Sequence, residues 1–188
     1  KKYLRQQSHR LKKEEMRFWN SIESIASISC SDSAYISKYC STCINTLSLY
    51  IENRHLEQVD LASKIDFFHL GAMDWLPNQE AIYWLLNKVW PELKKTENSA
   101  ELHIAGRGMP KNLISRKQSG YFNHLEVINA LEFISKHKVM LVPLFSGSGI
   151  RVKIIEGMAI GKCIISSSIG VEGIPCLDKK NILIANTK

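Results

Sequence analysis

The chain has 188 residues, of which 45% are hydrophobic, and its formal net charge is +7. That length suits one complete hydrophobic core and part of another. No stretch approaches the roughly 18 uninterrupted apolar residues of a transmembrane helix. The N-terminus is charged and no apolar segment follows it, so we also expect no signal peptide.

The excess positive charge is concentrated in residues 1–17, which hold seven Lys and Arg against two Glu. A nucleic-acid-binding surface would spread its charge over a folded face with interleaved aromatic side chains, and this run does not. Two interpretations stay open for the run. It is either a solvated helix face or a contact with an anionic membrane surface or lipid phosphate.

In chain order, the first elements are expected to be a helix over 1–24 and a strand over 25–30. A helix from Ser31 or Asp32 to Cys43 and a strand over 46–51 follow. Residues 52–63 have no clear hydrophobic period, which is typical of a linker.

The five cysteines are an odd number and indicate reduced thiols rather than a disulfide framework. Cys30 and Cys163 stand in apolar runs, so we expect them to be small buried hydrophobic residues. Cys40 and Cys43 have CxxC spacing, but no second pair completes a zinc site. The six histidines are scattered without ligand spacing, and no Asp-x-Asp is present, so no metal site is predicted.

From residue 64 onward, short apolar runs alternate with helical patterns. Strands are expected at 65–70, 101–105, 120–122, 139–144, 163–165 and 182–185, and helices at 79–95, 125–136 and 150–160. Pro91 should break or kink the first of these helices, and Ile128, Leu131 and Ile134 should face inward in the second. This alternation predicts an α/β fold with a doubly wound parallel sheet.

Ligands of such sheets bind beyond the carboxyl ends of the strands. Four loops are expected at that edge: 71–78, 106–110, 120–124 and 146–149. The last of these is a glycine-rich turn that enters a helix, where unpaired N–H groups and the helix dipole attract an anion. Arg151 and Lys153 in the first helical turn indicate that an anion is bound there, and Glu156 could accept hydrogen bonds from hydroxyl groups. The pattern therefore predicts a site for a phosphate beside a polyol.

The run from Glu156 to Ile165 resembles the donor-binding motif of the GT-B-fold retaining glycosyltransferases of family 4 (glycosyl transferases group 1). Ser148 stands where that family usually has a first Glu, which puts in doubt how the donor sugar is held. Residues 71–78 (GAMDWLPN) also resemble a segment of the family. Many relatives carry an Arg and a Lys there, and this chain lacks both. Arg151, Lys153 or Arg107 would then supply the charge that the donor diphosphate needs.

The resemblance implies three regions. Residues 1–51 would be the tail of an acceptor-side N-terminal domain, residues 52–63 a linker, and residues 64–188 a Rossmann-like nucleotide-sugar-binding domain that is truncated at its C-terminus. It also implies that Arg151 and Lys153 stabilise the leaving diphosphate. The other donor-binding residues implied are Gly71, Gly106, Arg107, Tyr121, Phe122, Gly147, Ser148, Gly149, Ile150, Glu156 and Glu172.

The function implied is transfer of a sugar, with retention, from a UDP- or GDP-sugar to a glycan or lipid-linked acceptor, as in polysaccharide biosynthesis. No metal or other cofactor is expected, and the isolated fragment should be inactive. The expected location is the cytoplasm, with contact between residues 1–17 and the inner face of the membrane. Two alternatives stay open: a sugar-nucleotide epimerase of the same fold, and a non-catalytic nucleotide-binding or interaction domain.

Overall fold

The computed structural model describes the whole chain except residues 1, 48, 50, 52–64 and 188. The chain divides into two compact units, Lys1–Tyr50 and Ile51–Lys188. The linker expected at 52–63 lies outside the described residues. None of the described helices combines the length and the apolar character that crossing a membrane requires.

The N-terminal unit consists of two helices and a small sheet. Helix α1 (Lys2–Trp19) has no buried residue. Strand β1 (Ser24–Ser27) pairs in parallel with β2 (Cys43–Thr46), and α2 (Cys30–Ile36) connects them. Both expected strands are shorter and earlier than predicted. The first strand ends early because Ser29, rather than Ser31 or Asp32, caps α2 by accepting a hydrogen bond from the backbone N–H of Asp32 at 3.0 Å.

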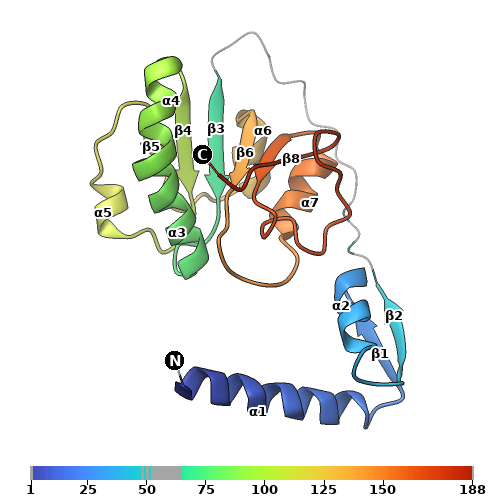
Figure 1. Ribbon diagram of the computed structural model, residues 1–188. Coiled ribbons are helices and arrows are strands. Elements are labelled where there is room, and N and C mark those ends of the chain that lie inside the picture. Colours follow the sequence, from blue (N-terminus) through green and yellow to red (C-terminus); the bar gives the residue numbers. More distant parts are fainter. Residues whose placement is uncertain (1, 48, 50, 52–64, 188) are drawn as a thin grey trace. The chain divides into compact units, whose positions relative to one another are not determined.

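The larger unit is built on a six-stranded sheet of order β5-β4-β3-β6-β7-β8, in which every pairing is parallel (Figure 1). Its strands are β3 (Asp66–Leu70), β4 (Glu101–Ala105), β5 (Tyr121–Asn123), β6 (Val139–Val142), β7 (Cys163–Ser166) and β8 (Leu183–Ile184). The predicted doubly wound α/β fold is therefore confirmed.

Helices cover both faces of this sheet, because its strands are apolar on both sides. One core cluster joins Leu102 and Ile104 to the helical segment that contains Leu86 and Trp90. The other joins Phe68 and Val142 to two further helices. The helices of the first layer are α3 (Leu76–Trp84), a π-helical segment (Leu85–Val89), α4 (Trp90–Thr96) and the short α5 (Lys111–Ile114); those of the second layer are α6 (Ala130–Lys136) and α7 (Val152–Ala159).

Pro91 does not break the long helix, which was one of the two predicted effects; the helix is instead distorted just before it, by the π-helical segment that ends at Val89. The N–H of Trp90 donates to the carbonyl of Leu85, one residue further back than in an α-helix. This wider turn makes room for a residue that has no N–H. The helical path from Leu76 to Thr96 is therefore uninterrupted.

Helix α6 begins five residues later than expected. Asn129 caps it by accepting a hydrogen bond from the N–H of Glu132, so the cap residue overrides the apolar period upstream. As a result, Ile128 is fully exposed and not inward-facing, whereas Ile134 is buried.

The expectation that Cys30 and Cys163 are buried is wrong, since both are exposed. Cys163 lies at the start of β7, where the alternate residues Ile164 and Ser166 face the core.

Candidate functional site

Two of the loops that follow the strands are joined to each other at the carboxyl edge of the sheet. The N–H of Gly71 donates to the carbonyl of Ala105, and the N–H of Met73 donates to the carbonyl of Arg107 at 2.8 Å. Gly106 has φ +151°, and a Cβ on it would lie 1.8 Å from the carbonyl oxygen of Gly71. Only glycine permits this close approach. The loops after β3 and β4 therefore form one packed surface.

The glycine-rich loop after β6 packs against this surface through Trp75. A Cβ on Gly147 would lie 2.8 Å from the ring of Trp75 and 2.8 Å from Nη2 of Arg151. The Arg151 guanidinium lies over the same ring, 5.1 Å from its centroid, which is a cation–π geometry. Three loops thus meet at the residue that precedes α7.

The side chain of Arg151 is 8% exposed and folds back onto the loop that precedes it. Its Nη1 donates to the carbonyls of Ser148 and Gly149, at 2.6 and 2.7 Å. Its Nε and Nη2 are buried without a hydrogen-bond partner among the described residues. Burial lowers the pKa of Arg151, and the nearby charge of Glu172 partly opposes this effect. A buried cation with unpaired donors is a site for an anionic or carbonyl ligand.

Lys153 reaches the segment around Gly71. Its ammonium donates to the carbonyl of Leu70 at 2.9 Å and to Oδ1 of Asn78 at 3.4 Å. Burial, followed by repulsion from Arg151, lowers the pKa of Lys153 to about 7. Within the described part of the chain, neither Arg151 nor Lys153 forms an ion pair with a carboxylate.

His69 completes this polar cluster. Its Nδ1 lies 2.8 Å from the carbonyl of Leu141, which can only accept, so Nδ1 carries the proton. Its buried Nε2 has no partner among the described residues. Nε2 and the Lys153 ammonium each lie 3.0 Å from the point that a Cβ on Gly71 would occupy. Burial and the charge of Lys153 hold the pKa of His69 well below its usual value, so the ring is neutral.

Some of the remaining predicted residues lie near the cation cluster and others do not. Of those on or next to the loops of the carboxyl edge and α7, Glu156 is half-buried in α7, and Ser148, Gly149, Arg107 and Glu172 are exposed. Arg107 pairs with Asp74 at 3.3 Å. Ile150 immediately precedes Arg151 and is not helical.

The side chains of Tyr121 and Phe122 are not brought to this cluster. Strand β5 is one of the two edge strands of the sheet and is separated from β6 by β4 and β3. The Tyr121 hydroxyl donates to the carbonyl of Leu113, and Phe122 stacks on His103 with ring centroids 4.9 Å apart.

Three residues of the cluster were not singled out from the sequence: His69, Trp75 and Asn78. Trp75 and Asn78 belong to the 71–78 segment whose resemblance was noted, so a signal for them existed. His69 lies inside a strand, and only the pairing of β3 with β6 reveals its position.

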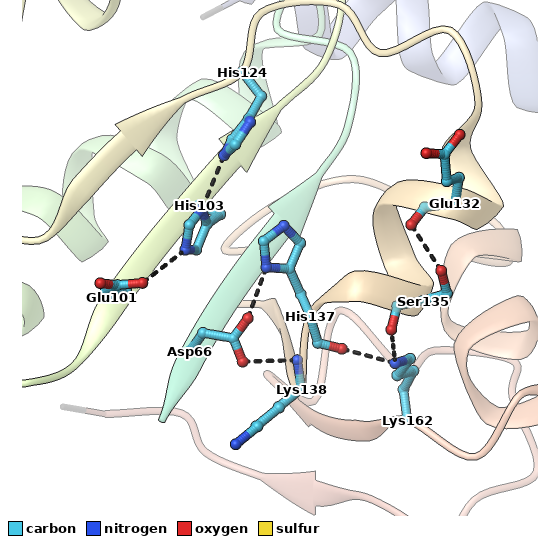
Figure 2. Close-up of polar contacts among 9 residues, drawn as sticks. All are labelled: Asp66, Glu101, His103, His124, Glu132, Ser135, His137, Lys138 and Lys162. Carbon is cyan, nitrogen blue, oxygen red and sulfur yellow. Dashed lines mark hydrogen bonds and ion pairs between the residues drawn. The ribbon is translucent and has the colours of Figure 1, made fainter. Parts of the chain in front are cut away.

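The interpretation of the histidines as scattered is wrong for three of them. His103, His124 and His137 come from separate segments, yet each offers a ring nitrogen that lies within 4.8 Å of the others (Figure 2).

Comparison with known proteins gives consistent matches. The family described as "Glycosyl transferases group 1" matches residues 64–188. An uncharacterized 44.6 kDa protein in the cps region of Klebsiella pneumoniae is 27% identical over 124 residues, which cover 60% of this chain and 31% of that protein.

Among solved structures, TarM is similar with a TM-score of 0.73 and 17% identity, covering 92% of this chain and 36% of TarM. The pneumococcal O-GlcNAc transferase GtfA, in complex with UDP and GlcNAc, has a TM-score of 0.60 and 13% identity over 79% of this chain and 30% of GtfA. WaaG, a glycosyltransferase involved in lipopolysaccharide biosynthesis, has a TM-score of 0.57 and 12% identity over 77% of this chain and 44% of WaaG. The chain thus spans about a third of the length of the first of these relatives.

Proposed function

The chain belongs to the group 1 glycosyltransferases, and on that premise we propose that residues 64–188 bind the nucleotide of a sugar donor at the carboxyl edge of the six-stranded sheet. The whole protein would transfer the sugar, with retention, to a glycan or lipid-linked acceptor, without a metal ion in the transfer step.

One observation carries this proposal: Arg151 and Lys153 are held at the N-terminal end of α7 without a partner carboxylate in the described residues. Burial removes water from both side chains, and this loss of hydration lowers the pKa of each. Burying two neighbouring cations is costly unless an anion accompanies them. A diphosphate would supply that anion, and backbone N–H groups at the start of α7 would bind it as well.

In the transfer step, negative charge develops on the leaving diphosphate as the glycosidic bond breaks. The Arg151 Nε and Nη2 groups and the Lys153 ammonium would stabilise this charge, together with the backbone of Gly147, Ser148, Gly149 and Ile150. Because these groups are already fixed by Trp75, Asn78 and the loop carbonyls, little reorganisation is needed.

We assign the ribose hydroxyls to Glu156, which lies one turn further along α7 from Lys153. Gly71, Gly106 and Arg107 would line the site from the neighbouring loops, and Glu172 would close it near Arg151. Tyr121 and Phe122 would read the base through their main chain, because their side chains are engaged elsewhere. That UDP occupies the TarM and GtfA structures supports a nucleoside diphosphate as the ligand.

We further propose that residues 1–51 are the tail of the acceptor-side domain, since the similarity to TarM covers 92% of the chain and so extends beyond the family match. The exposed helix α1 carries the basic residues, and these would contact the inner, anionic face of the membrane from the cytoplasm.

Calorimetric titration of this chain with UDP, GDP and a panel of their sugars tests the donor site. We expect UDP or GDP to bind and free uridine or guanosine to bind more weakly, because the cations contact the diphosphate. If none of these ligands bound, the proposed site would be wrong.

Turnover by the full-length protein then separates the transferase from its rivals. Release of free nucleotide with a glycosylated product supports transfer. An altered sugar that stays on the nucleotide would indicate an epimerase, and binding without turnover would indicate a non-catalytic domain.

A further inference from the structure

Three imidazole rings converge on the α6 side of the sheet, away from the α7 loop. His103 lies in the middle of β4, His124 directly follows β5, and His137 follows α6. The ring centroids of His103 and His137 are 4.2 Å apart, and those of His103 and His124 are 5.1 Å apart. Nδ1 of His103 lies 2.8 Å from Nε2 of His124. The parallel register of His103 with Phe122 places His103 and His124 on one face.

Carboxylates face the outer nitrogens of two of these rings, as Figure 2 shows. Oδ2 of Asp66 accepts from Nδ1 of His137 at 2.7 Å, and Oδ1 of Asp66 accepts from the N–H of Lys138. Oε2 of Glu101 lies 3.6 Å from Nε2 of His103. The hydrogen bond to Asp66 fixes the proton on Nδ1 of His137, and the negative charge of Glu101 favours a proton on Nε2 of His103. The other nitrogens, Nδ1 of His103 and Nε2 of His137, therefore present lone pairs to the centre of the cluster.

Burial favours the neutral form of the rings, and the cluster is accessible on one side. Burial lowers the pKa of all three histidines and repulsion between the rings acts in the same direction, whereas the carboxylate of Asp66 opposes burial at His103 and His137. Among the described residues, Lys162 lies beside the cluster, and its ammonium donates to the carbonyls of Ser135 and His137. His124 is exposed, so solvent reaches the cluster from its side.

We propose that His103, His124 and His137 form a three-histidine site for a divalent transition-metal ion, with Zn²⁺ as the natural occupant and water as the fourth ligand. Imidazole nitrogens are preferred ligands of Zn²⁺, and a carboxylate on the opposite ring nitrogen is the usual outer partner of a zinc-bound histidine. Asp66 would be this outer partner for His137, and Glu101 would be the outer partner for His103.

Binding requires the rings to rearrange, because the ligand nitrogens lie up to 4.8 Å apart and the wider pairs would have to draw together. Two nitrogens at about 2.0–2.1 Å from a tetrahedral zinc ion are about 3.3 Å apart, so His103 and His124 would separate slightly from their 2.8 Å contact. In the metal-free protein this contact is a hydrogen bond, in which Nε2 of His124 donates. Binding moves that proton to Nδ1 of His124, which is on the exposed ring, and no net proton is released.

The ion would act as a clamp. It would join the edge strand β5 to β4 and to the end of α6, across the non-helical segment 125–129. Edge strands with only three residues have few backbone bonds of their own. A ligand that binds only the folded state stabilises it by mass action, and the segment between His124 and His137 gains most.

The first test is titration of the chelator-treated protein with Zn²⁺ by calorimetry, followed by Co²⁺ absorption spectroscopy. We expect one Zn²⁺ per chain with an affinity in the micromolar range or tighter, a rise in melting temperature with Zn²⁺, and a Co²⁺ spectrum of tetrahedral nitrogen–oxygen ligation without a thiolate charge-transfer band. Absence of binding, or a thiolate band, would overturn the proposal.

Variants then locate the ion. His124→Gln should weaken Zn²⁺ binding by more than about 100-fold, and Asp66→Asn by about 10- to 100-fold, because outer partners orient the ligand. The matched controls are His9→Gln, an exposed histidine on α1, and Cys40→Ser combined with Cys43→Ser; neither should change binding. Equal affinity in His124→Gln, or a loss in the cysteine variant, would refute the site. Since the wild-type Co²⁺ spectrum reports the ligand types directly, a variant that fails to fold still leaves a decisive measurement.

Discussion

Two polar clusters in residues 66–187 have opposite requirements. At the carboxyl edge, Arg151 and Lys153 gather positive charge and hydrogen-bond donors. On the α6 side, the histidines gather lone pairs and are backed by the carboxylates of Asp66 and Glu101. The first cluster therefore suits an anion and the second a cation. The difference teaches that the charges and the free donors or lone pairs gathered in a polar cluster indicate the sign of the ligand that the cluster suits.

The largest effect should come from breaking the junction of loops that supports the cation cluster. In Gly106→Ala, the new Cβ would overlap the carbonyl of Gly71 at a backbone angle that favours glycine, which should cost about 3 kcal/mol or more of unfolding free energy. Urea denaturation measures this cost. The control is Gly161→Ala, where φ is +71° but no atom lies within 4 Å, with an expected cost of about 1 kcal/mol. If the two variants lost the same unfolding free energy, the loops after β3 and β4 would not be tightly packed at Gly106.

Arg151→Met should have the next largest effect, on ligand binding. Loss of charged hydrogen bonds should weaken UDP or GDP binding by about 10- to 100-fold while free nucleoside binding changes little. The salt dependence of binding should also fall. Calorimetry at two salt concentrations measures both effects, and Lys111→Met, at an exposed lysine on α5, is the control. An unchanged salt profile would remove Arg151 from the anion site.

Glu156→Ala should separate the two halves of the nucleotide. Nucleoside binding should weaken about tenfold through lost hydroxyl contacts, while binding of inorganic diphosphate should stay the same. Glu132→Ala, at an exposed residue paired with Lys136, should change neither. A similar loss for nucleoside and diphosphate would contradict the ribose assignment.

The smallest and most specific expected effect is the uptake of a proton by Lys153 when a ligand binds. Its pKa of about 7 in the free protein should rise when a diphosphate approaches, so binding near pH 8 should take up as much as about one proton. The groups facing its ammonium are Arg151, the neutral His69, Asn78 and the carbonyl of Leu70. Calorimetry in buffers of different ionisation enthalpy measures the uptake, and Lys153→Met should abolish it.

The same group affects stability without ligand. Between pH 7 and 10.5 the unfolded chain binds more protons at Lys153 than the folded chain does, so the contribution of Lys153 to unfolding free energy increases with pH in that range. A wild-type stability curve that matches that of Lys153→Met would contradict the lowered pKa.

Sequence patterns predicted the fold and the position of the α7 loop because both depend on local signals. Apolar runs marked the strands, and the glycine-rich turn before Arg151 marked the helix start. The partners of those residues could not be predicted in this way. Lys153 meets Asn78, which is 75 residues away, and His103 meets His124, which is 21 residues away. Such contacts depend on strand order and register, which emerge only when the sheet forms.

The local errors have a common cause as well. At Ser29 and Asn129, a single capping hydrogen bond fixes where a helix begins, whatever the apolar period suggests. At Pro91, a wide turn accommodates a residue that would otherwise end the helix. In each case, backbone hydrogen bonding outweighed side-chain pattern.

The stacking of Trp75 on Arg151 provides an optical reporter. Because the indole also touches Gly147, any ligand that shifts the guanidinium changes the surroundings of this fluorophore. Its emission can therefore follow occupancy in real time with an unlabelled chain, once the other three tryptophans, Trp19, Trp84 and Trp90, are replaced by phenylalanine.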